Sequence, residues 1–106
     1  MLNEKTATSQ IVGGISQAMF EETVADQVTG RIANATCGDY LMPVNADVPD
    51  VEVLFVRWSR PRDRVGTKGI GEIDLVGLAA AIGNAVFHAT GRRVRSLPIT
   101  IDQLML

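Results

Sequence analysis

Residues 66–91 read GTKGIGEIDLVGLAAAIGNAVFHATG, a glycine-rich loop that passes directly into a long apolar stretch. Gly91 closes the stretch, and glycine is typical of the residue just beyond a helix C-terminus. Within it, apolar residues recur at the three- and four-residue spacing of one helical face, at Leu75, Leu78, Ala79, Ile82, Val86 and Ala89. The sequence therefore predicts a helix over about 73–90 that ends at Gly91.

This predicted helix has no side suited to water. Its other face carries small or uncharged residues, and no charged residue lies between Asp74 and Arg92. A helix that is apolar all round is normally buried, and a chain of 106 residues is too small to enclose one unaided. We therefore expect the helix to be buried against a partner surface, in a homo-oligomer or a larger assembly. Two glycines and an asparagine interrupt the charge-free stretch, so we expect it to be too short and too broken to span a membrane.

Residues 6–23 predict another helix, because their apolar residues also follow helical spacing. Gly13 and Gly14 lie inside this pattern. Each glycine lowers helix stability by about 1 kcal/mol relative to alanine, so the pair indicates close approach of another backbone or of a ligand. The alternative is a frayed helix start.

Four segments predict β-strands. Two of them flank Gly30, whose freedom to adopt a positive φ suits the turn of a hairpin. A third is rich in β-branched and aromatic residues, and the fourth is an edge strand that stops at Pro98. The four segments are residues 22–26, 31–35, 51–56 and 93–97. With Thr100 capping a last turn around Leu104, the expected fold class is α+β: a small antiparallel sheet packed with two main helices, the second apolar all round.

The composition is that of one globular domain spanning residues 1–106. The chain is 46% hydrophobic and 21% charged, with a formal net charge of −2 and a mean hydropathy of +0.16. The single cysteine, Cys37, cannot form a disulfide within the chain, and the N-terminus lacks the pattern of a secretory signal. We therefore expect a cytoplasmic protein.

Acidic and basic residues are divided between the two halves of the chain. Residues 1–56 carry eight acids and two bases, whereas residues 57–106 carry eight bases and four acids. The bases form two short groups with Trp58 as the interleaved aromatic residue, a weak pattern for nucleic-acid binding. Solvated loops with internal salt bridges explain the charge better, and an anionic partner or cofactor is the next hypothesis.

The glycine-rich loop before the apolar helix is the best candidate for a site. Glycines at a helix N-terminus favour bound anions, but the spacing matches neither the phosphate-loop nor the dinucleotide-loop signature. Glu72 lies in the first helical turn, where a rigid helix can aim its carboxylate as a general base; the alternative is an ordinary helix-start acid. His88 suits a helix C-terminus, and Cys37 has no second cysteine or histidine at ligand spacing, so we expect no metal held by side chains.

The most specific motif is Lys68-Gly-Ile-Gly-Glu72, followed by the small-residue helix. Other motifs accompany it in order: Leu2-Asn3, Thr6-Ala7, Ser9-Gln10, Gly13-Gly14, Glu21-Glu22, Thr29-Gly-Arg31, Pro43-Val-Asn-Ala-Asp-Val-Pro49 and Ala79 to Leu97. Together they resemble the C-terminal end of the molybdopterin-binding large subunit of the molybdenum hydroxylases. This family includes xanthine dehydrogenase, aldehyde oxidoreductase and aerobic carbon monoxide dehydrogenase.

The resemblance implies a molybdopterin cofactor and an oxidoreductase that hydroxylates aldehydes or N-heterocycles. Glu72 matches the family's active-site glutamate, the general base, while Gln10, Gly69 and Gly71 match residues close to the cofactor. Family subunits carry several hundred residues before this point. We therefore expect a fragment or stand-alone remnant that contributes Glu72, is inactive alone and does not hold the cofactor by itself. Its partner is then the missing remainder of the large subunit.

Two other hypotheses follow from the residues alone. In the first, the chain is a non-catalytic interaction module of the same fold that uses the apolar helix to oligomerise. In the second, residues 66–72 bind an anion or a nucleotide.

Overall fold

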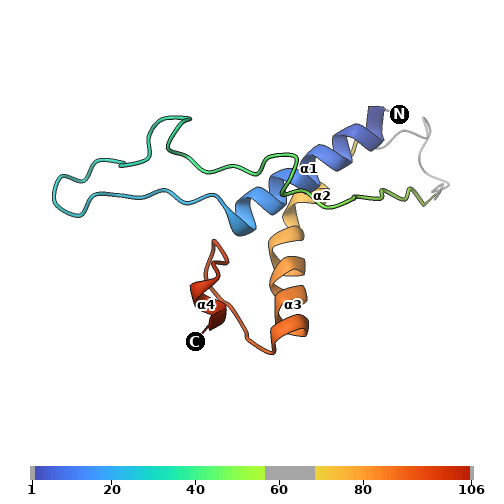
Figure 1. Cartoon of the computed structure of the whole chain (residues 1–106). Helices are drawn as coiled ribbons and strands as arrows, with labels where there is room; N and C mark the ends of the chain where they lie inside the picture. The colour runs from blue at the N-terminus through green and yellow to red at the C-terminus, as the bar shows by residue number, and fades with distance from the viewer. Residues whose placement is uncertain (1, 57–68, 106) are drawn as a thin grey trace.

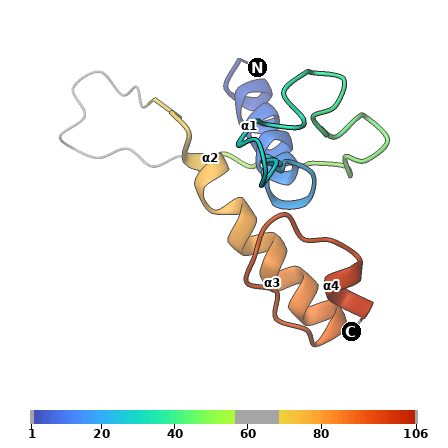
Figure 2. The same cartoon turned by 90° about the vertical axis from the view of Figure 1, so that its left-hand side faces the viewer.

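A computed structural model of the chain describes residues 2–56 and 69–105. The helices are α1 (Leu2–Met19), α2 (Ile73–Val76), α3 (Leu78–Thr90) and α4 (Asp102–Met105). α1 crosses α2 and the start of α3, and the C-terminal segment folds back beside α3 (Figure 1). Figure 2 shows this relation from the side, with α4 next to the far end of α3.

The crossing of α1 with α2 and α3 depends on glycine at position 14. A Cβ on Gly14 would lie 2.6 Å from Cδ2 and 2.7 Å from Cβ of Leu78, at the start of α3. A Cβ on Gly13 would lie 3.6 Å from Cδ1 of Leu75, which is an ordinary contact. Because the Leu78 Cβ is fixed to its backbone, any larger residue at position 14 must push the helices apart. The two glycines predicted close approach of another backbone or of a ligand, and at Gly14 the structure instead shows close approach of the Leu78 side chain.

The buried core is small and lies along one side of α1. The Ile99 N–H donates a 2.8 Å hydrogen bond to the Ala18 carbonyl, which ties the C-terminal segment to the last turn of α1. The buried apolar side chains are those of Ala7, Ile15, Ala18 and Ile99. α1 therefore organises the chain by packing on α3 near its middle and on residue 99 near its end.

The second predicted helix is present but divided. Gly77 separates α2 from α3 while keeping right-handed angles of φ −89° and ψ −10°. The predicted end is confirmed, because Gly91 adopts φ 73° and donates its N–H to the Phe87 carbonyl at 2.7 Å. The glycine at position 77 thus interrupts the apolar pattern without changing the helical sense of the backbone.

Two other predicted boundaries are wrong. α1 begins at Leu2 and ends at Met19, whereas the sequence pattern predicted a helix over 6–23. The last turn begins at Asp102, so it does not start from a cap at Thr100. Helix ends depend on local packing more than on periodicity, which explains the shifts.

The predicted α+β fold class is wrong, because the described residues form helices and coil without a sheet. The four predicted strand segments contain one antiparallel bridge, between Ala25 and Ile32. Residues 51–56 have strand-like composition, yet Leu54 and Val56 are 79% and 88% exposed. A strand needs a neighbour to pair with and a surface to cover, and this part of the chain supplies neither.

The hairpin keeps its predicted turn without its strands. Gly30 adopts φ 69° and donates its N–H to the Asp26 carbonyl at 2.8 Å. Hydrogen bonds from the Thr29 hydroxyl and the Val28 N–H to the Asp26 carboxylate lower the pKa of Asp26. The turn is therefore stabilised by its own side chains.

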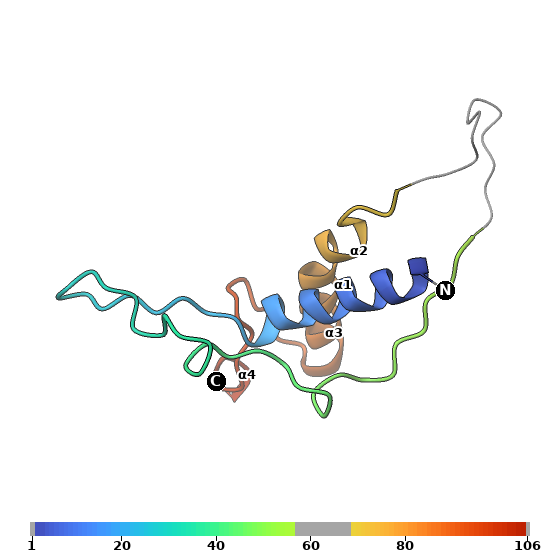
Figure 3. The same ribbon diagram turned by 90° about the horizontal axis from the view of Figure 1, so that it is seen from above.

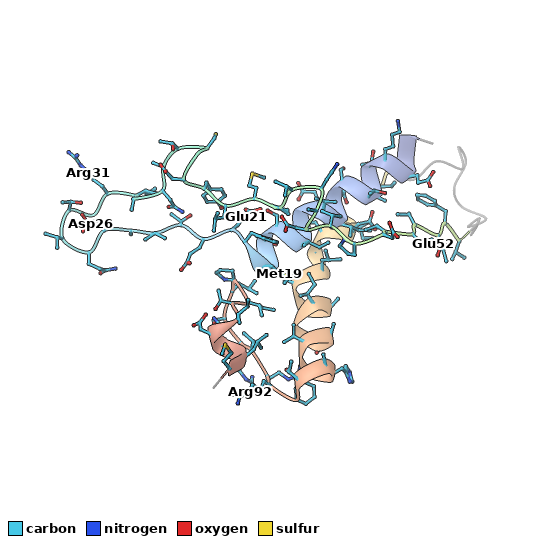
Figure 4. All side chains as sticks on the ribbon, in the orientation of Figure 1. Met19, Glu21, Asp26, Arg31, Glu52 and Arg92 are labelled. Carbon is cyan, nitrogen blue, oxygen red and sulfur yellow. The ribbon has the colours of Figure 1, made fainter. Side chains whose placement is uncertain are left out.

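This hairpin extends away from the helices, as seen from above in Figure 3. Asp26 and Arg31 lie at its far end in Figure 4. The chain returns to α1 through Tyr40, whose hydroxyl donates to Glu21 Oε2 at 3.2 Å. Partial burial and the neighbouring Glu21 carboxylate raise the pKa of Tyr40.

Many large apolar side chains of the described residues are exposed. The chain's radius of gyration is 17.6 Å, against about 13 Å for a compact domain of about 100 residues. Its accessible surface is 8966 Å², whereas a folded monomer of 11.4 kDa has roughly 5,800 Å². Neither α2 nor α3 contains a buried residue, so this chain does not enclose the helix unaided, and its burial against a partner surface stays a prediction. An apolar helix in this position needs cover from outside these residues.

Residues Ile73–Thr90 also meet the criterion of length and composition for a membrane span, with a mean hydropathy of 1.4 over 18 residues. By this measure the expectation that the stretch is too short is wrong. One such helix is weak evidence for a membrane, because the core helix of a soluble protein meets the same criterion.

Replacement of Gly14 by alanine tests the helix crossing. We expect Gly14→Ala to destabilise the chain by about 1–3 kcal/mol, because the clash with Leu78 exceeds the gain in helix propensity of about 1 kcal/mol. Gly13→Ala is the matched control and should be neutral or stabilising, since its new methyl group makes an ordinary contact. Urea unfolding followed by far-ultraviolet circular dichroism measures both. Equal stability of the two variants would contradict the crossing.

Candidate functional site

The loop that precedes α2 forms a tight turn over residues 70–73. The Ile73 N–H donates a 3.3 Å hydrogen bond to the Ile70 carbonyl. Gly71 has φ 57° and Glu72 has φ −109°, the φ pattern of a type II′ turn, which favours glycine at its first central position. Glycine at position 71 is therefore required by the fold of the loop itself.

Gln10 of α1 binds this turn through both ends of its side-chain amide. Its Nε2 donates to the Gly71 carbonyl, and its Oε1 accepts a 3.3 Å hydrogen bond from the Asp74 N–H. The two backbone groups have opposite polarity, which fixes the orientation of the amide. α1 thus holds the residues on both sides of Glu72.

The Glu72 side chain is exposed and makes no capping hydrogen bond to the first turn of α2. Its backbone carbonyl accepts the Leu75 N–H at 3.1 Å, so the main chain of Glu72 is engaged in the helix start while the carboxylate is not. An ordinary helix-start acid stabilises its own helix by bonding to the free N–H groups. This carboxylate is instead free to meet a group from outside α2.

The two predicted glycines of the loop differ in what the chain requires of them. Gly71 needs its positive φ, as described above. Gly69 has no positive φ, and a Cβ there would meet no atom within 4 Å. Nothing within the described chain explains a glycine at position 69.

The predicted residues Gln10, Gly71 and Glu72 come together in the structure, with Gly69 immediately before the turn. His88 lies on the exposed side of α3, where its ring meets the Phe87 ring edge-on at 6.0 Å. Cys37 is a free and exposed thiol. Within residues 2–56 and 69–105, no three His, Cys, Asp or Glu side chains gather into a metal-binding group.

A second polar site was not predicted from the sequence. Arg93 lies over the Phe87 ring at 4.0 Å and donates to Asn84 Oδ1 at 2.8 Å. It borders a groove of about 380 Å³ between α3 and the C-terminal segment, which Arg95 and Ser96 also line. Asn84 and Phe87 are three residues apart on one helix face, and this spacing is the signal that could have revealed the contact.

The partner of Gln10 was also missed by sequence reasoning. The family resemblance places Gln10 near a cofactor, whereas the structure shows its amide bonded to the backbone of residues 71 and 74. Gln10 is separated from Gly71 by 61 residues and from Asp74 by 64 residues, so no local sequence pattern connects them. Only the helix crossing reveals these contacts.

Comparison with known proteins shows several relatives that match almost the whole chain. The chain is 44% identical over 110 residues to the aldehyde oxidoreductase molybdenum-binding subunit PaoC of Escherichia coli K12. This match covers 99% of this chain and 15% of that subunit. The chain is 39% identical over 108 residues to the xanthine dehydrogenase molybdenum-binding subunit of Escherichia coli O157:H7, covering 98% of this chain and 14% of that protein. No protein-family model matches the sequence.

A solved structure gives the same result. The crystal structure of quinoline 2-oxidoreductase from Pseudomonas putida 86 matches with a TM-score of 0.73 and 30% identity, over 95% of this chain and 14% of that one. The chain therefore spans about one seventh of the proteins that it matches. Over nearly its whole length, the chain is therefore similar to one segment of the molybdenum-binding subunits of molybdenum hydroxylases.

Proposed function

We propose that this chain supplies the general-base glutamate, Glu72, of a molybdopterin-dependent hydroxylase that acts on aldehydes or N-heterocycles. One observation carries the proposal: the Glu72 carboxylate is exposed and unused by its own helix, while Gln10 fixes the backbone on both sides of it. A general base needs a free carboxylate whose backbone is held in place.

The residues present fit one wall of a cofactor site. The loop offers open space at Gly69 and a free carboxylate at Glu72, and no described cluster of side chains would compete to bind a metal directly. Gly69 and Gly71 would lie against the molybdopterin cofactor, whereas both ends of the Gln10 amide are bonded to the backbone of the turn. When bound, that cofactor supplies the oxidation–reduction chemistry of the hydroxylation.

In this proposal the chain has two roles in the reaction: Glu72 accepts a proton, and the turn positions the backbone of Glu72. Glu72 accepts a proton at a carboxylate oxygen from the group that attacks the substrate, and the turn at Gly71 sets the backbone from which this side chain extends. The other walls of the site, the substrate pocket and most cofactor contacts belong to the remainder of the large subunit. The chain is therefore inactive alone in this proposal.

The exposed apolar surface of α2 and α3 also supports the proposal that the remainder of the large subunit completes the site. Ile73 and Val76 are 72% and 81% exposed, and relatives are about seven times longer than this chain. In our proposal the remainder of the large subunit covers these side chains, so that residues 1–106 form the C-terminal part of a molybdopterin-binding domain. The free Cys37 thiol suits a reducing compartment, and the proposed location is the cytoplasm.

A non-catalytic interaction module is the second candidate, and the same exposed apolar side chains favour it. In that case a second copy of the chain, and not the remainder of a subunit, covers α2 and α3. The two candidates differ in what Glu72 does, since an oligomerising module has no need of its carboxylate.

Replacing Glu72 by glutamine distinguishes the candidates. In a chimera that carries this chain in place of the matching residues of the E. coli aldehyde oxidoreductase subunit, Glu72→Gln should lower turnover by about 10² to 10⁴ with cofactor content unchanged. In the isolated chain it should change stability by less than about 0.3 kcal/mol, because the side chain makes no cap. The matched control is Glu22→Gln, another exposed carboxylate. Unchanged turnover together with a clear loss of stability would identify Glu72 as a helix-start acid.

The isolated chain should carry no stoichiometric molybdenum. Too few of its residues face the cofactor, and those residues are exposed or half-buried, so they cannot enclose a large anionic group. Elemental analysis of the purified chain measures this directly. About one molybdenum atom per chain, with oxidation of an aldehyde by a dye acceptor, would show that the chain is a complete site.

The isolated chain should also self-associate, because exposed apolar helices bury surface by pairing. We expect sedimentation equilibrium at tens of micromolar to give a dimer or a larger species. A lone 11.4 kDa monomer that binds no hydrophobic dye would contradict an uncovered apolar surface.

A further inference from the structure

We infer that Gln10 is a positioning residue for Glu72: its side-chain amide holds the turn at residues 70–73 and the start of α2, and so fixes the direction of the carboxylate. This inference rests on the proposed role of Glu72 as a base. It gives Gln10 a task within the protein, which differs from the cofactor contact that the sequence predicts for it.

The two hydrogen bonds of Gln10 bracket Glu72. One reaches the carbonyl of Gly71, immediately before it, and the other reaches the N–H of Asp74, two residues after it. Glu72 itself receives no side-chain bond in this arrangement, so its carboxylate stays free while its backbone is held from both sides. We call these two hydrogen bonds the Gln10 clamp. The clamp restricts the direction of the Glu72 side chain without occupying its carboxylate.

α2 needs such a clamp because it is only four residues long. A single helical turn is unstable by itself, since its nucleation is unfavourable and few of its hydrogen bonds are internal. The Asp74 N–H lies in that first turn and has no partner within α2, and Gln10 accepts from it. Gln10 therefore does for α2 what a capping residue does, from a different helix.

The clamp is set by the same helix crossing as Gly14. Gln10 and Gly14 are four residues apart on α1, and their partners Asp74 and Leu78 are also four residues apart. Residues at this spacing lie on the same helix face, so the amide contact and the glycine contact form two successive levels of one interface. The close approach at Gly14 thus brings Gln10 within reach of the turn.

The test uses the chimera with the E. coli aldehyde oxidoreductase subunit and the variant Gln10→Met, which keeps the length and helix propensity of glutamine but removes the amide. Gln17→Met is the matched control, because Gln17 is an exposed glutamine on the same helix. Three quantities are measured: hydrogen–deuterium exchange of the peptide spanning residues 71–77 in the cofactor-free chimera, molybdenum content, and kcat and KM of the loaded chimera.

We expect Gln10→Met to raise exchange in this peptide about tenfold while exchange in the rest of α3 stays unchanged. Molybdenum content should equal that of the control, and kcat should fall at least tenfold with little change in KM, because displacement of a base lowers the rate of the chemical step. Unchanged exchange with lower molybdenum content would overturn the inference and identify Gln10 as a cofactor contact. Exchange, metal content and kcat all equal to the control would also overturn it.

A second variant applies if Gln10→Met does not fold. Gln10→Glu retains the acceptor for the Asp74 N–H but cannot donate to the Gly71 carbonyl, so we expect increased exchange over residues 71–77 with α1 intact. Unchanged exchange would contradict the clamp. Glu72→Gln in the same chimera separates the two proposals: if that variant keeps full turnover, Glu72 is not the base, whereas the exchange measurement still decides whether Gln10 holds the turn.

Discussion

The contact between Gly14 and Leu78 is the constraint on which the rest of this structure depends. With no side chain at position 14, α1 lies directly against the start of α3, where any Cβ would meet the Cβ of Leu78 at 2.7 Å. One helical turn away, the same approach brings the Gln10 amide onto the backbone that flanks Glu72. The packing of Leu78 on Gly14 therefore helps to hold the backbone around a carboxylate that the packing itself does not touch.

The described chain also leaves many of its apolar side chains exposed. α1 covers a small core, while α2 and α3 have no buried residue and the strand-like residues 51–56 pair with no other strand in the described chain. The chain spans about one seventh of the length of its relatives. In our proposal both observations have one explanation, since the rest of such a subunit supplies the missing surfaces. In our proposal the chain contributes the turn at residues 70–73 and the apolar helix, and the rest of the large subunit supplies the other walls of the cofactor site.

The sequence predicted what depends on local pattern. Helical spacing, the end at Gly91 and the turn at Gly30 follow from residues close together in the chain, and the structure agrees with each. The α+β sheet was wrong because β-propensity states how a segment pairs when a partner exists, and none is present in the described residues. The loop motif located Glu72 and Gly71, but the bridge from Gln10 joins positions more than sixty residues apart and leaves no local signal.

The most direct test of this account is a crystal structure of the chimera with the E. coli aldehyde oxidoreductase subunit. The account predicts that Leu78 lies against Gly14, that the Gln10 amide bridges Gly71 and Asp74, and that Ile73 and Val76, exposed in this chain, are buried by residues from outside it. The Glu72 carboxylate should face an open site. A structure in which α2 and α3 remain exposed to solvent, or in which α1 no longer crosses them at Gly14, would contradict it.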